Sequence, residues 1–348
     1  MVLLFESPIK ITKGKNMSKV RVAINGFGRI GRLVLRAALE SGRDDIEFVA
    51  VNDLAPAEQN AYLLKYDSVH GNLPMDIKLD GDYIIAGNHK IKCLSERNPA
   101  DLPWGEMNVD IVMECTGIFT AADKARVHLD AGAKRVLVSA PSAGADKTIV
   151  FGVNQDTLTS DDLIVSNASC TTNCLAPVVK VLNDKYGIVS GWMTTVHAYT
   201  GDQQLLDKNH KDFRRARAAN LSMIPTSTGA AKAIGLVLPE LAGKLDGMAI
   251  RVPTPDVSVV ELVVNLENNA TVEDINAAMK AAESKTFGYN DLPLVSIDFT
   301  HDALSSVFDA GQTKVLGDKL VHVTAWYDNE WGFSNRMCDT AVAMGKLI

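Results

Sequence analysis

The six residues Gly26-Phe27-Gly28-Arg29-Ile30-Gly31 decide the fold, because they follow the spacing G-x-G-x-x-G. The spacing alone is a weak signal, since glycine triplets occur by chance. Its surroundings strengthen it: residues 19–25 read as a strand with apolar side chains on one face, and residues 30–40 carry apolar side chains at helical spacing. A glycine-rich turn between a strand and a helix is typical of a dinucleotide-binding fold.

Each glycine of this turn has a separate task. Gly26 allows the tight turn, Gly28 lets a pyrophosphate approach the backbone, and Gly31 lets the helix pack closely on the strand. The start of the helix offers amide donors to the phosphates. Asp53 follows the next apolar run, so its carboxylate can accept from both ribose hydroxyls and repel a 2′-phosphate. These residues indicate NAD rather than NADP; the alternative is a glycine-rich turn beside an ordinary surface aspartate.

Outward from this turn, the first half of the chain alternates short β-branched runs with helical stretches, as parallel sheets do. Further short strands are predicted at residues 48–52, 110–114 and 135–139. After a helix over residues 170–185, longer strand-like runs at residues 193–197, 248–252, 257–266 and 320–327 are typical of an antiparallel sheet. We therefore predict an α/β fold: a Rossmann-type doubly wound parallel sheet domain, followed by an α+β catalytic domain with a mostly antiparallel sheet.

The predicted domains are residues 17–169 for NAD binding and residues 170–333 for catalysis. A helix over residues 334–348 is expected to pack back onto the first domain. Residues 1–16 are expected to form a leader outside this core, because the stretch from Met17 reads like a fresh start. Residues 200–224 form a long, polar, charged loop, and a loop of that length inside a compact domain is usually functional.

Composition sets limits on partners and compartment. The 348 residues carry a net charge of −7, which gives no general attraction to nucleic acid or to anionic membranes. No apolar run reaches the length of a membrane span. The five scattered cysteines indicate reduced thiols, and hence a cytoplasmic protein. No metal site is predicted, because the Cys170 and Cys174 pair lacks further ligands at suitable spacing.

The stretch from Ser166 to Cys174 contains the candidate nucleophile, Cys170. Ser169 is a plausible helix cap, which places Cys170 in the first turn, where backbone amides and the helix dipole favour a thiolate and lower the cysteine pKa. The alternative is a small buried cysteine without chemistry, which is our interpretation of Cys174. A nucleophilic thiol needs a base, and His197, between an apolar strand and a hydroxyl-rich turn, is the best of several candidates.

Together these pieces resemble the phosphorylating glyceraldehyde-3-phosphate dehydrogenases, of the glycolytic, bacterial-like type. The resemblance runs from about Val20 to the C-terminus. It rests on the stretches already quoted and on residues 194–200, 225–232, 247–254 and 326–332, which contain TTVHAYT, PTSTGAAK, GMAIRVPT and WYDNEWG. Such a set, in this order, is very specific.

The resemblance implies roles for individual residues. Cys170 is the nucleophile and His197 the acid and base. The implied NAD contacts are Gly26, Gly28, Arg29, Ile30, Gly31, Asp53, Arg97, Ser139 and Asn329. Inorganic phosphate is expected at Ser169, Thr171, Thr228 and Gly229, and the substrate's own phosphate at Thr200 and Arg251. One of Arg215 and Arg217, here taken as Arg217, serves the phosphate pockets.

Without the resemblance, the residues themselves leave some choices open. Arg251 lies inside an apolar strand, so it needs an anionic partner, either a structural carboxylate or a ligand. The chain also departs from many strictly NAD-using relatives, which carry Leu-Pro where Lys208-Asn209 stands here. That departure weakens the expected preference for NAD, although Asp53 still opposes a 2′-phosphate.

The implied reaction converts D-glyceraldehyde 3-phosphate, NAD⁺ and inorganic phosphate into 1,3-bisphosphoglycerate through a cysteine hemithioacetal and thioester, in glycolysis and gluconeogenesis. A homotetramer is expected, with the loop from Thr200 near a neighbouring cofactor. One alternative is erythrose-4-phosphate dehydrogenase, which uses the same cysteine. Another is a binding role toward RNA or a host surface, which the acidic balance does not support.

Overall fold

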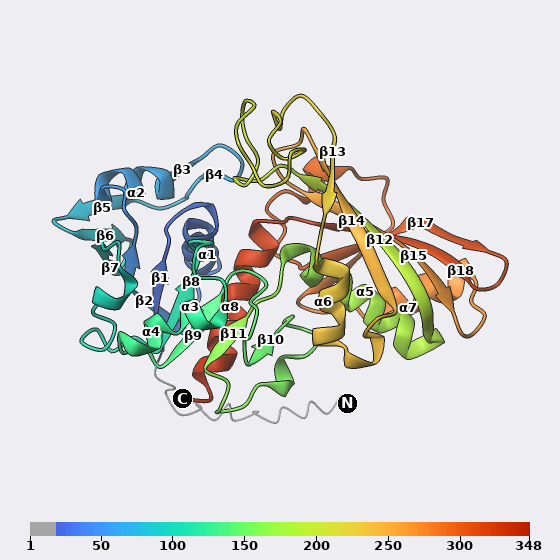
Figure 1. Cartoon of the computed structure of the whole chain (residues 1–348), viewed down its shortest axis with the longest axis horizontal. Coiled ribbons are helices and arrows are strands. Elements are labelled where there is room, and N and C mark those ends of the chain that lie inside the picture. The colour runs from blue at the N-terminus through green and yellow to red at the C-terminus, as the bar shows by residue number, and fades with distance from the viewer. Residues whose placement is uncertain (1–18) are drawn as a thin grey trace, which may run out of the picture.

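The computed structural model describes residues 19–348. The expected leader, residues 1–16, and the restart at Met17 lie outside the described residues. Figure 1 shows two bodies side by side, with the C-terminal helix α8 (Trp331–Gly345) running between them. No helix within the described range is both long and apolar enough to cross a membrane.

Within residues 19–348, the first body is built on a nine-stranded sheet in the order β10-β11-β9-β8-β1-β2-β7-β6-β5. Its centre is parallel, because β1 pairs in parallel with both β2 and β8. The strands are β1 Val20–Asn25, β2 Ile46–Asn52, β5 Ile77–Asp80, β6 Tyr83–Ala86, β7 His89–Leu94, β8 Ile111–Glu114, β9 Arg135–Val138, β10 Lys147–Thr148 and β11 Ile164–Ser166. The predicted Rossmann-type sheet is confirmed, and it carries an antiparallel edge, β5 to β7, that the pattern did not indicate.

Two helices pack against each other beside this sheet. Helix α1 (Arg29–Glu40) buries Leu33, Val34 and Leu35, which recur at helical spacing. Helix α8 contributes buried side chains such as Met337 to the same core. The C-terminus therefore returns to the first body, even though most of the second body precedes it in the chain.

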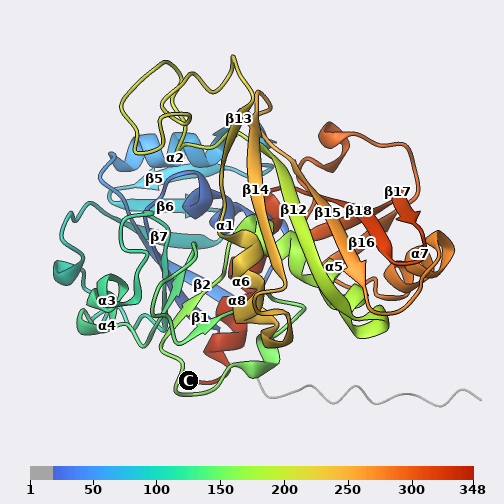
Figure 2. The ribbon, with the colours of Figure 1, turned by 45° about the vertical axis from the view of Figure 1, so that its right-hand side comes forward.

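Within the same residue range, the second body is built on a seven-stranded sheet in the order β13-β14-β12-β15-β18-β17-β16. Its strands are β12 Ile188–Ala198, β13 Ile224–Ser227, β14 Leu245–Val252, β15 Ser258–Leu266, β16 Phe287–Asn290, β17 Ser306–Leu316 and β18 Leu320–Tyr327. Most neighbours are antiparallel, as predicted, but β12 pairs in parallel with β14, and β16 with β17. Helices α5 (Cys170–Tyr186), α6 (Ala230–Val237) and α7 (Val272–Ala281) lie against this sheet (Figure 2).

The two sheets divide the chain between β11 and α5. We propose that the domain boundary lies there, between residues 169 and 170. Helix α5 packs on the core of the second body, whereas the residues before it, apart from part of the connecting loop, belong to the first body. Cys170 contacts both cores. The first residue of α5 therefore stands where the two bodies meet.

The remaining elements are short or connect the sheets. They are α2 Ala57–Lys65, α3 Ala122–Ala125, α4 Val127–Asp130, the hairpin of β3 Tyr66–Asp67 and β4 Gly71–Asn72, and the 3₁₀ turns Pro99–Asp101, Gln155–Thr157, Pro239–Leu241 and Ser296–Phe299. Between β12 and β13, residues 199–223 form the predicted long loop, which contains neither a helix nor a strand of either sheet. Figure 1 shows this loop projecting above both bodies.

Candidate active site

Cys170 is the first residue of α5, as the predicted helix cap required. The Ser169 hydroxyl accepts a hydrogen bond from the Thr172 amide at 3.1 Å and so caps the helix. Ala168, just before the cap, has a left-handed backbone with φ of +58°, a conformation that costs a non-glycine residue on the order of 1 kcal/mol. The side chain of Asn173 donates to the Asn167 carbonyl at 2.9 Å and holds this turn closed. The turn thus fixes the position of the thiol.

His197 lies opposite this thiol, although 26 residues separate the two in the chain. Its Nε2 is 3.5 Å from Cys170 Sγ. Its Nδ1 is 2.7 Å from the Ala198 carbonyl and 3.2 Å from Arg251 Nη1. The carbonyl can only accept and lies closer, so we assign the proton of a neutral ring to Nδ1. Nε2 is then free to accept a proton from the sulfur side.

The parallel pairing of β12 with β14 brings a cation to the same place. In this register His197 stands directly across from Arg251. The Arg251 Nη1 donates to the Ala198 carbonyl at 3.1 Å and to the Thr200 hydroxyl at 3.2 Å. One strand pair therefore positions the base, the arginine and the hydroxyl.

The protonation states differ from the prediction. Burial raises the pKa of the Cys170 thiol, although the charge of Arg251 and the Thr171 amide act in the opposite direction. Burial, helped by Arg251, lowers the pKa of His197 to about 3. The expectation that the helix start leaves the cysteine pKa below its ordinary value is therefore wrong, because desolvation exceeds the effect of the amides. Both shifts favour a thiol facing a neutral imidazole.

Tyr327 organises this pair and was not singled out from the sequence. Its hydroxyl bonds to the hydroxyls of Thr171 at 2.8 Å and Thr195 at 2.9 Å. Its ring meets His197 edge-on, with the ring centres 5.9 Å apart. The only sequence signal was a tyrosine at the end of an apolar strand, and nothing in that pattern pointed to the thiol.

The starts of two helices face each other beside Cys170. The Thr172 hydroxyl donates to the Ala230 carbonyl at 3.5 Å and joins the first turns of α5 and α6. At the start of α6, the Thr228 hydroxyl accepts from the Ala230 amide at 3.2 Å, and a side chain added at Gly229 would meet open space. Two adjacent helix starts offer unpaired amides and positive dipole ends, which suit an anion.

Arg251 is half-buried, and its charge has no carboxylate partner in a salt bridge anywhere in residues 19–348. Its Nε atom is buried and has no hydrogen-bond partner among those residues either. A partly desolvated guanidinium without a counter-charge is costly. Of the two partners that the sequence left open, a structural carboxylate or a ligand, the structure favours the ligand.

The two candidate arginines of the 199–223 loop differ in their exposure and in their partners. Arg217 is exposed and its Nε donates to Asp207 at 2.8 Å, away from the strands of the site. Arg215 is more buried and donates to the Thr226 hydroxyl at 2.9 Å, and its charge lowers the pKa of His197. Of the two arginines that the sequence left open, we therefore propose Arg215 rather than Arg217 as the loop arginine of the site.

The glycine-rich turn borders a separate cavity of about 330 Å³ in the first body. A Cβ at Gly26 would lie 2.6 Å from the Thr116 amide, and one at Gly31 would lie 2.1 Å from the Gly26 carbonyl. A Cβ at Gly28 would meet no atom within 4 Å. The first and third glycines thus allow close packing, whereas the second leaves its backbone open toward the cavity.

Asp53 borders the same cavity from the end of β2. Its Oδ2 accepts from the Phe27 amide at 2.8 Å and its Oδ1 from the Ala55 amide at 3.0 Å, so the carboxylate is held in place by backbone. An anchored carboxylate, an open glycine and a helix start together fit the ribose and pyrophosphate of a dinucleotide.

The other predicted cofactor residues lie around these. Arg97 is exposed and lines the cavity, while Ile30 is half-buried in the first turn of α1. The Arg29 side chain turns away to Asp67 and Glu330, which leaves only its backbone for a cofactor. Ser139 follows β9, and the buried Asn329 follows β18 and accepts from the Ser258 hydroxyl at 2.7 Å.

Fold and site together define an NAD-dependent dehydrogenase with a thiol and an imidazole where its two bodies meet. Residues 20–122 match the profile described as glyceraldehyde 3-phosphate dehydrogenase, NAD binding domain, and residues 169–329 match its C-terminal domain. The chain therefore belongs to the glyceraldehyde-3-phosphate dehydrogenase family, and its cofactor is NAD.

Curated relatives agree with this assignment over nearly the whole chain. A glyceraldehyde-3-phosphate dehydrogenase of Xanthobacter flavus is 64% identical over 332 residues, which cover 94% of this chain and 99% of the relative. One from Cereibacter sphaeroides is 63% identical over 333 residues, with the same coverage. The chromosomal enzyme of Cupriavidus necator is 58% identical over 331 residues, 93% of this chain and 98% of the relative.

Proposed function

We propose that the chain oxidises D-glyceraldehyde 3-phosphate and joins the product to inorganic phosphate, giving 1,3-bisphosphoglycerate in glycolysis and the reverse reaction in gluconeogenesis. The observation that carries this proposal is the 3.5 Å approach of Cys170 Sγ to His197 Nε2, next to two helix starts and to Arg251, an arginine without a carboxylate partner among the described residues. The thiol supplies a covalent anchor for an aldehyde. The anion sites account for one phosphate on the substrate and one that attacks.

In the first step the Cys170 sulfur adds to the aldehyde carbon, and the thiol proton leaves through His197 and ends on the new hydroxyl. His197 can do this because its lowered pKa keeps Nε2 unprotonated at neutral pH. The positive charge of Arg251 stabilises the developing thiolate. The product of this step is a hemithioacetal on Cys170.

In the second step His197 takes the hydroxyl proton while the carbon loses a hydride, so the adduct becomes a thioester. Bound NAD⁺ supplies the hydride acceptor at C4 of its nicotinamide. Tyr327 and the Ala198 carbonyl keep the imidazole oriented for this second proton transfer. An oxygen of inorganic phosphate then attacks the thioester carbon, the carbon–sulfur bond breaks, and the Cys170 thiolate leaves.

We assign the two phosphates to the two groups of polar residues. The attacking phosphate lies at Ser169, Thr171, Thr228 and Gly229, where the helix starts supply amides and hydroxyls. The Thr171 hydroxyl already bonds to Tyr327, so its contribution is its backbone amide. The substrate's own phosphate binds Thr200 and Arg251, with Arg215 nearby to add charge.

A spectrophotometric assay tests the reaction. Purified chain is mixed with glyceraldehyde 3-phosphate and NAD⁺, and NADH is followed with and without inorganic phosphate. We expect steady turnover only when phosphate is present. Steady turnover without phosphate, or faster oxidation of erythrose 4-phosphate, contradicts the proposal and favours a dehydrogenase that releases its product by hydrolysis.

We also propose that the chain works in the cytoplasm as a homotetramer. Large apolar side chains of the 199–223 loop support association, because Leu205, Phe213 and Leu221 are each more than three-quarters exposed in the single chain. Sedimentation of the purified chain tests this. A monomer at micromolar concentration contradicts it, and Phe213→Ser is expected to weaken the assembly.

A further inference from the structure

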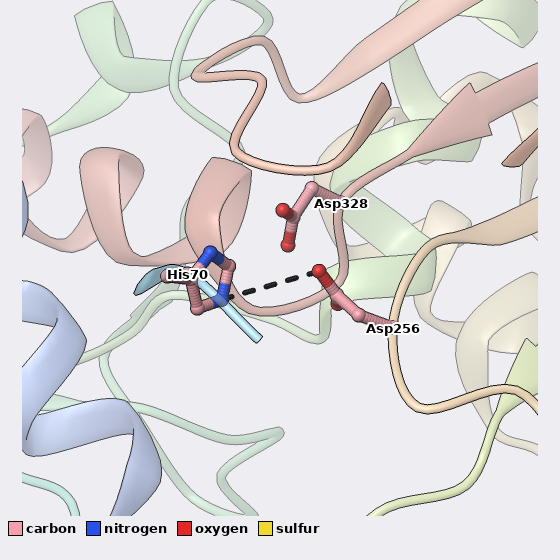
Figure 3. A group of neighbouring side chains, drawn as sticks. All are labelled: His70, Asp256 and Asp328. Carbon is pink, nitrogen blue, oxygen red and sulfur yellow. Dashed lines mark ion pairs between the residues drawn. The ribbon is translucent and has the colours of Figure 1, made fainter. Parts of the chain in front are cut away.

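A second group of titratable side chains lies outside the residues used by the reaction. His70, in the turn between β3 and β4, meets Asp256, which precedes β15, and Asp328, which follows β18 (Figure 3). One nitrogen and two carboxylate oxygens from these residues lie within 4.8 Å of one another. The side chains of His70 and Asp256 are 0% and 2% exposed, and Asp328 is 1% exposed as a whole residue. Three segments far apart in the sequence thus place potential metal ligands at one buried point.

Backbone amides hold the side chain of Asp328 in place. Its Oδ1 accepts from the amides of Glu330 at 2.9 Å and Trp331 at 2.6 Å, and its Oδ2 accepts from the His301 amide at 2.7 Å. These three backbone donors fix the carboxyl group in one orientation.

Asp256 is different, because neither of its carboxylate oxygens has a hydrogen-bond partner within residues 19–348. Figure 3 shows its carboxylate directed toward His70 and Asp328. Two buried carboxylates this close together are unfavourable unless a positive charge joins them.

The Nε2 atom of His70 faces this group. It lies 3.9 Å from Asp256 Oδ2 and 3.3 Å from a Glu330 carboxylate oxygen, to which it donates, because a carboxylate can only accept. A metal ion bound at Nε2 takes the place of this ring proton. His70 Nδ1 lies 3.1 Å from Nδ1 of His301, whose Nε2 lies 2.9 Å from the Glu40 carboxylate.

We propose that His70, Asp256 and Asp328 bind a divalent transition-metal cation. First-row ions bind nitrogen and oxygen ligands at about 2.0–2.2 Å, so two ligands of one ion lie at most about 4.4 Å apart. The 3.9 Å between His70 and Asp256 fits within this limit, and the widest separation needs a shift of only a few tenths of an ångström. The other ring nitrogen of His70, Nδ1, has a hydrogen-bond partner in His301, as metal-bound imidazoles normally do at that nitrogen.

Charge around the site matches a doubly positive ion. Glu330 is compensated by Arg29, which bonds to both of its oxygens and also pairs with Asp67. Asp256 and Asp328 lie together, and no lysine or arginine among the described residues forms a salt bridge with either of them. One nitrogen with two carboxylates suits Mn²⁺ or Zn²⁺ better than the all-oxygen sites of Ca²⁺.

An ion can reach this point from outside the chain. Asp256 and Glu330 both line a cavity of about 490 Å³, which Thr200, Pro255 and Ile297 also border. Water filling this cavity can complete the coordination. The ion links the hairpin of the first body to two turns of the second, so it is expected to stabilise their contact.

Electron paramagnetic resonance with Mn²⁺ tests the site, because free Mn²⁺ gives a signal that is lost on binding. The full-length chain is first dialysed against a chelator and then titrated. We expect one ion per chain, and at least tenfold weaker binding for Asp256→Asn and for His70→Gln. The matched control is Asp302→Asn, a nearby carboxylate whose Oδ1 accepts only from the Leu304 amide, and it should bind as the unmodified chain does.

Thermal melting provides the second readout, so that a variant with altered folding still yields a result. Mn²⁺ should raise the Tm of the unmodified chain and of Asp302→Asn, and leave that of Asp256→Asn unchanged. Absence of binding at millimolar Mn²⁺, or equal binding by Asp256→Asn, overturns the proposal. The proposal is also overturned if the unmodified chain binds no Mn²⁺ and Asp256→Asn has a higher Tm than the unmodified chain. That result indicates that the two carboxyl groups share a proton instead.

Discussion

The glycine-rich turn and the thiol site bind their ligands in opposite ways. The turn consists of neighbouring residues and offers mainly backbone, since Gly26 and Gly31 allow close packing and Gly28 leaves the chain open. The thiol site collects side chains from α5, β12, β14 and β18, four elements that lie far apart in the sequence. A site of the first kind is encoded locally, whereas a site of the second kind depends on strand register and helix packing.

The largest effect is expected from a substitution that removes the centre of the thiol site and leaves the glycine-rich turn intact. Cys170→Ser should lower turnover by more than about 10³-fold, because a hydroxyl is a far weaker nucleophile than a thiolate. NAD affinity should stay within about twofold, since the turn and Asp53 belong to another cavity. Steady-state rates and calorimetric titration with NAD measure the two quantities. Cys174→Ser is the control, because this buried thiol bonds to Ser306 and should be nearly silent in turnover.

The local site can be tested by adding one methyl group at two of its glycines. Gly31→Ala forces a Cβ against the Gly26 carbonyl, so it should lower the free energy of unfolding by about 1–3 kcal/mol. Gly28→Ala should leave the free energy of unfolding within about 0.5 kcal/mol and weaken NAD binding about tenfold or more, because the methyl group occupies space that the pyrophosphate needs. Urea unfolding and NAD titration distinguish them. Equal effects of the two substitutions on both measurements would show that the glycines do not have separate tasks.

Charge in the assembled site can be tested through the pH dependence of thiol alkylation. Arg251 lowers the pKa of Cys170, so Arg251→Leu should move the alkylation profile to higher pH. The comparison belongs in a His197→Asn background, where only the thiol titrates. Removing the positive charge destabilises the thiolate, so the apparent pKa of the thiol should rise. An unchanged or lower apparent pKa would mean that Arg251 does not act on the sulfur.

The smallest effect is expected at the residue that only orients others. Tyr327→Phe removes two hydroxyl bonds, to Thr171 and Thr195, and should cost about 1–3 kcal/mol of stability. Turnover should fall only several-fold, with NAD affinity unchanged. Chemical unfolding and initial rates measure these. A loss of turnover as large as that of Cys170→Ser would instead give Tyr327 a direct part in the chemistry.

Prediction from sequence succeeded where the signal was local and periodic. The strand before the glycine turn, α1, α5, β15 and β18 were all predicted to within a few residues, because long apolar periodicity identifies them. The antiparallel edge β5 to β7 was missed because edge strands such as Ile77–Asp80 bury little and alternate weakly. The parallel pairing of β12 with β14 could not be read from sequence, since register depends on tertiary packing.

The same distinction between local signals and tertiary packing explains which parts of the site could be predicted from sequence. Cys170 and His197 could be chosen from their neighbours in sequence, but the approach of Tyr327 and the choice of Arg215 over Arg217 follow from strand order and loop path. The cysteine pKa was predicted in the wrong direction because helix position is visible in sequence and burial is not. The group of His70, Asp256 and Asp328 was invisible for the same reason, because no spacing rule connects its three segments.

The proposed mechanism depends most on Cys170, whose sulfur atom holds the substrate. The most direct measurement is mass spectrometry of the acid-quenched, digested chain after mixing with glyceraldehyde 3-phosphate and NAD⁺ without inorganic phosphate. We predict an acyl group on the peptide that carries Cys170, and its disappearance within one turnover once phosphate is added. NADH formation without any acylated peptide, or acylation that persists after phosphate is added, would contradict the account.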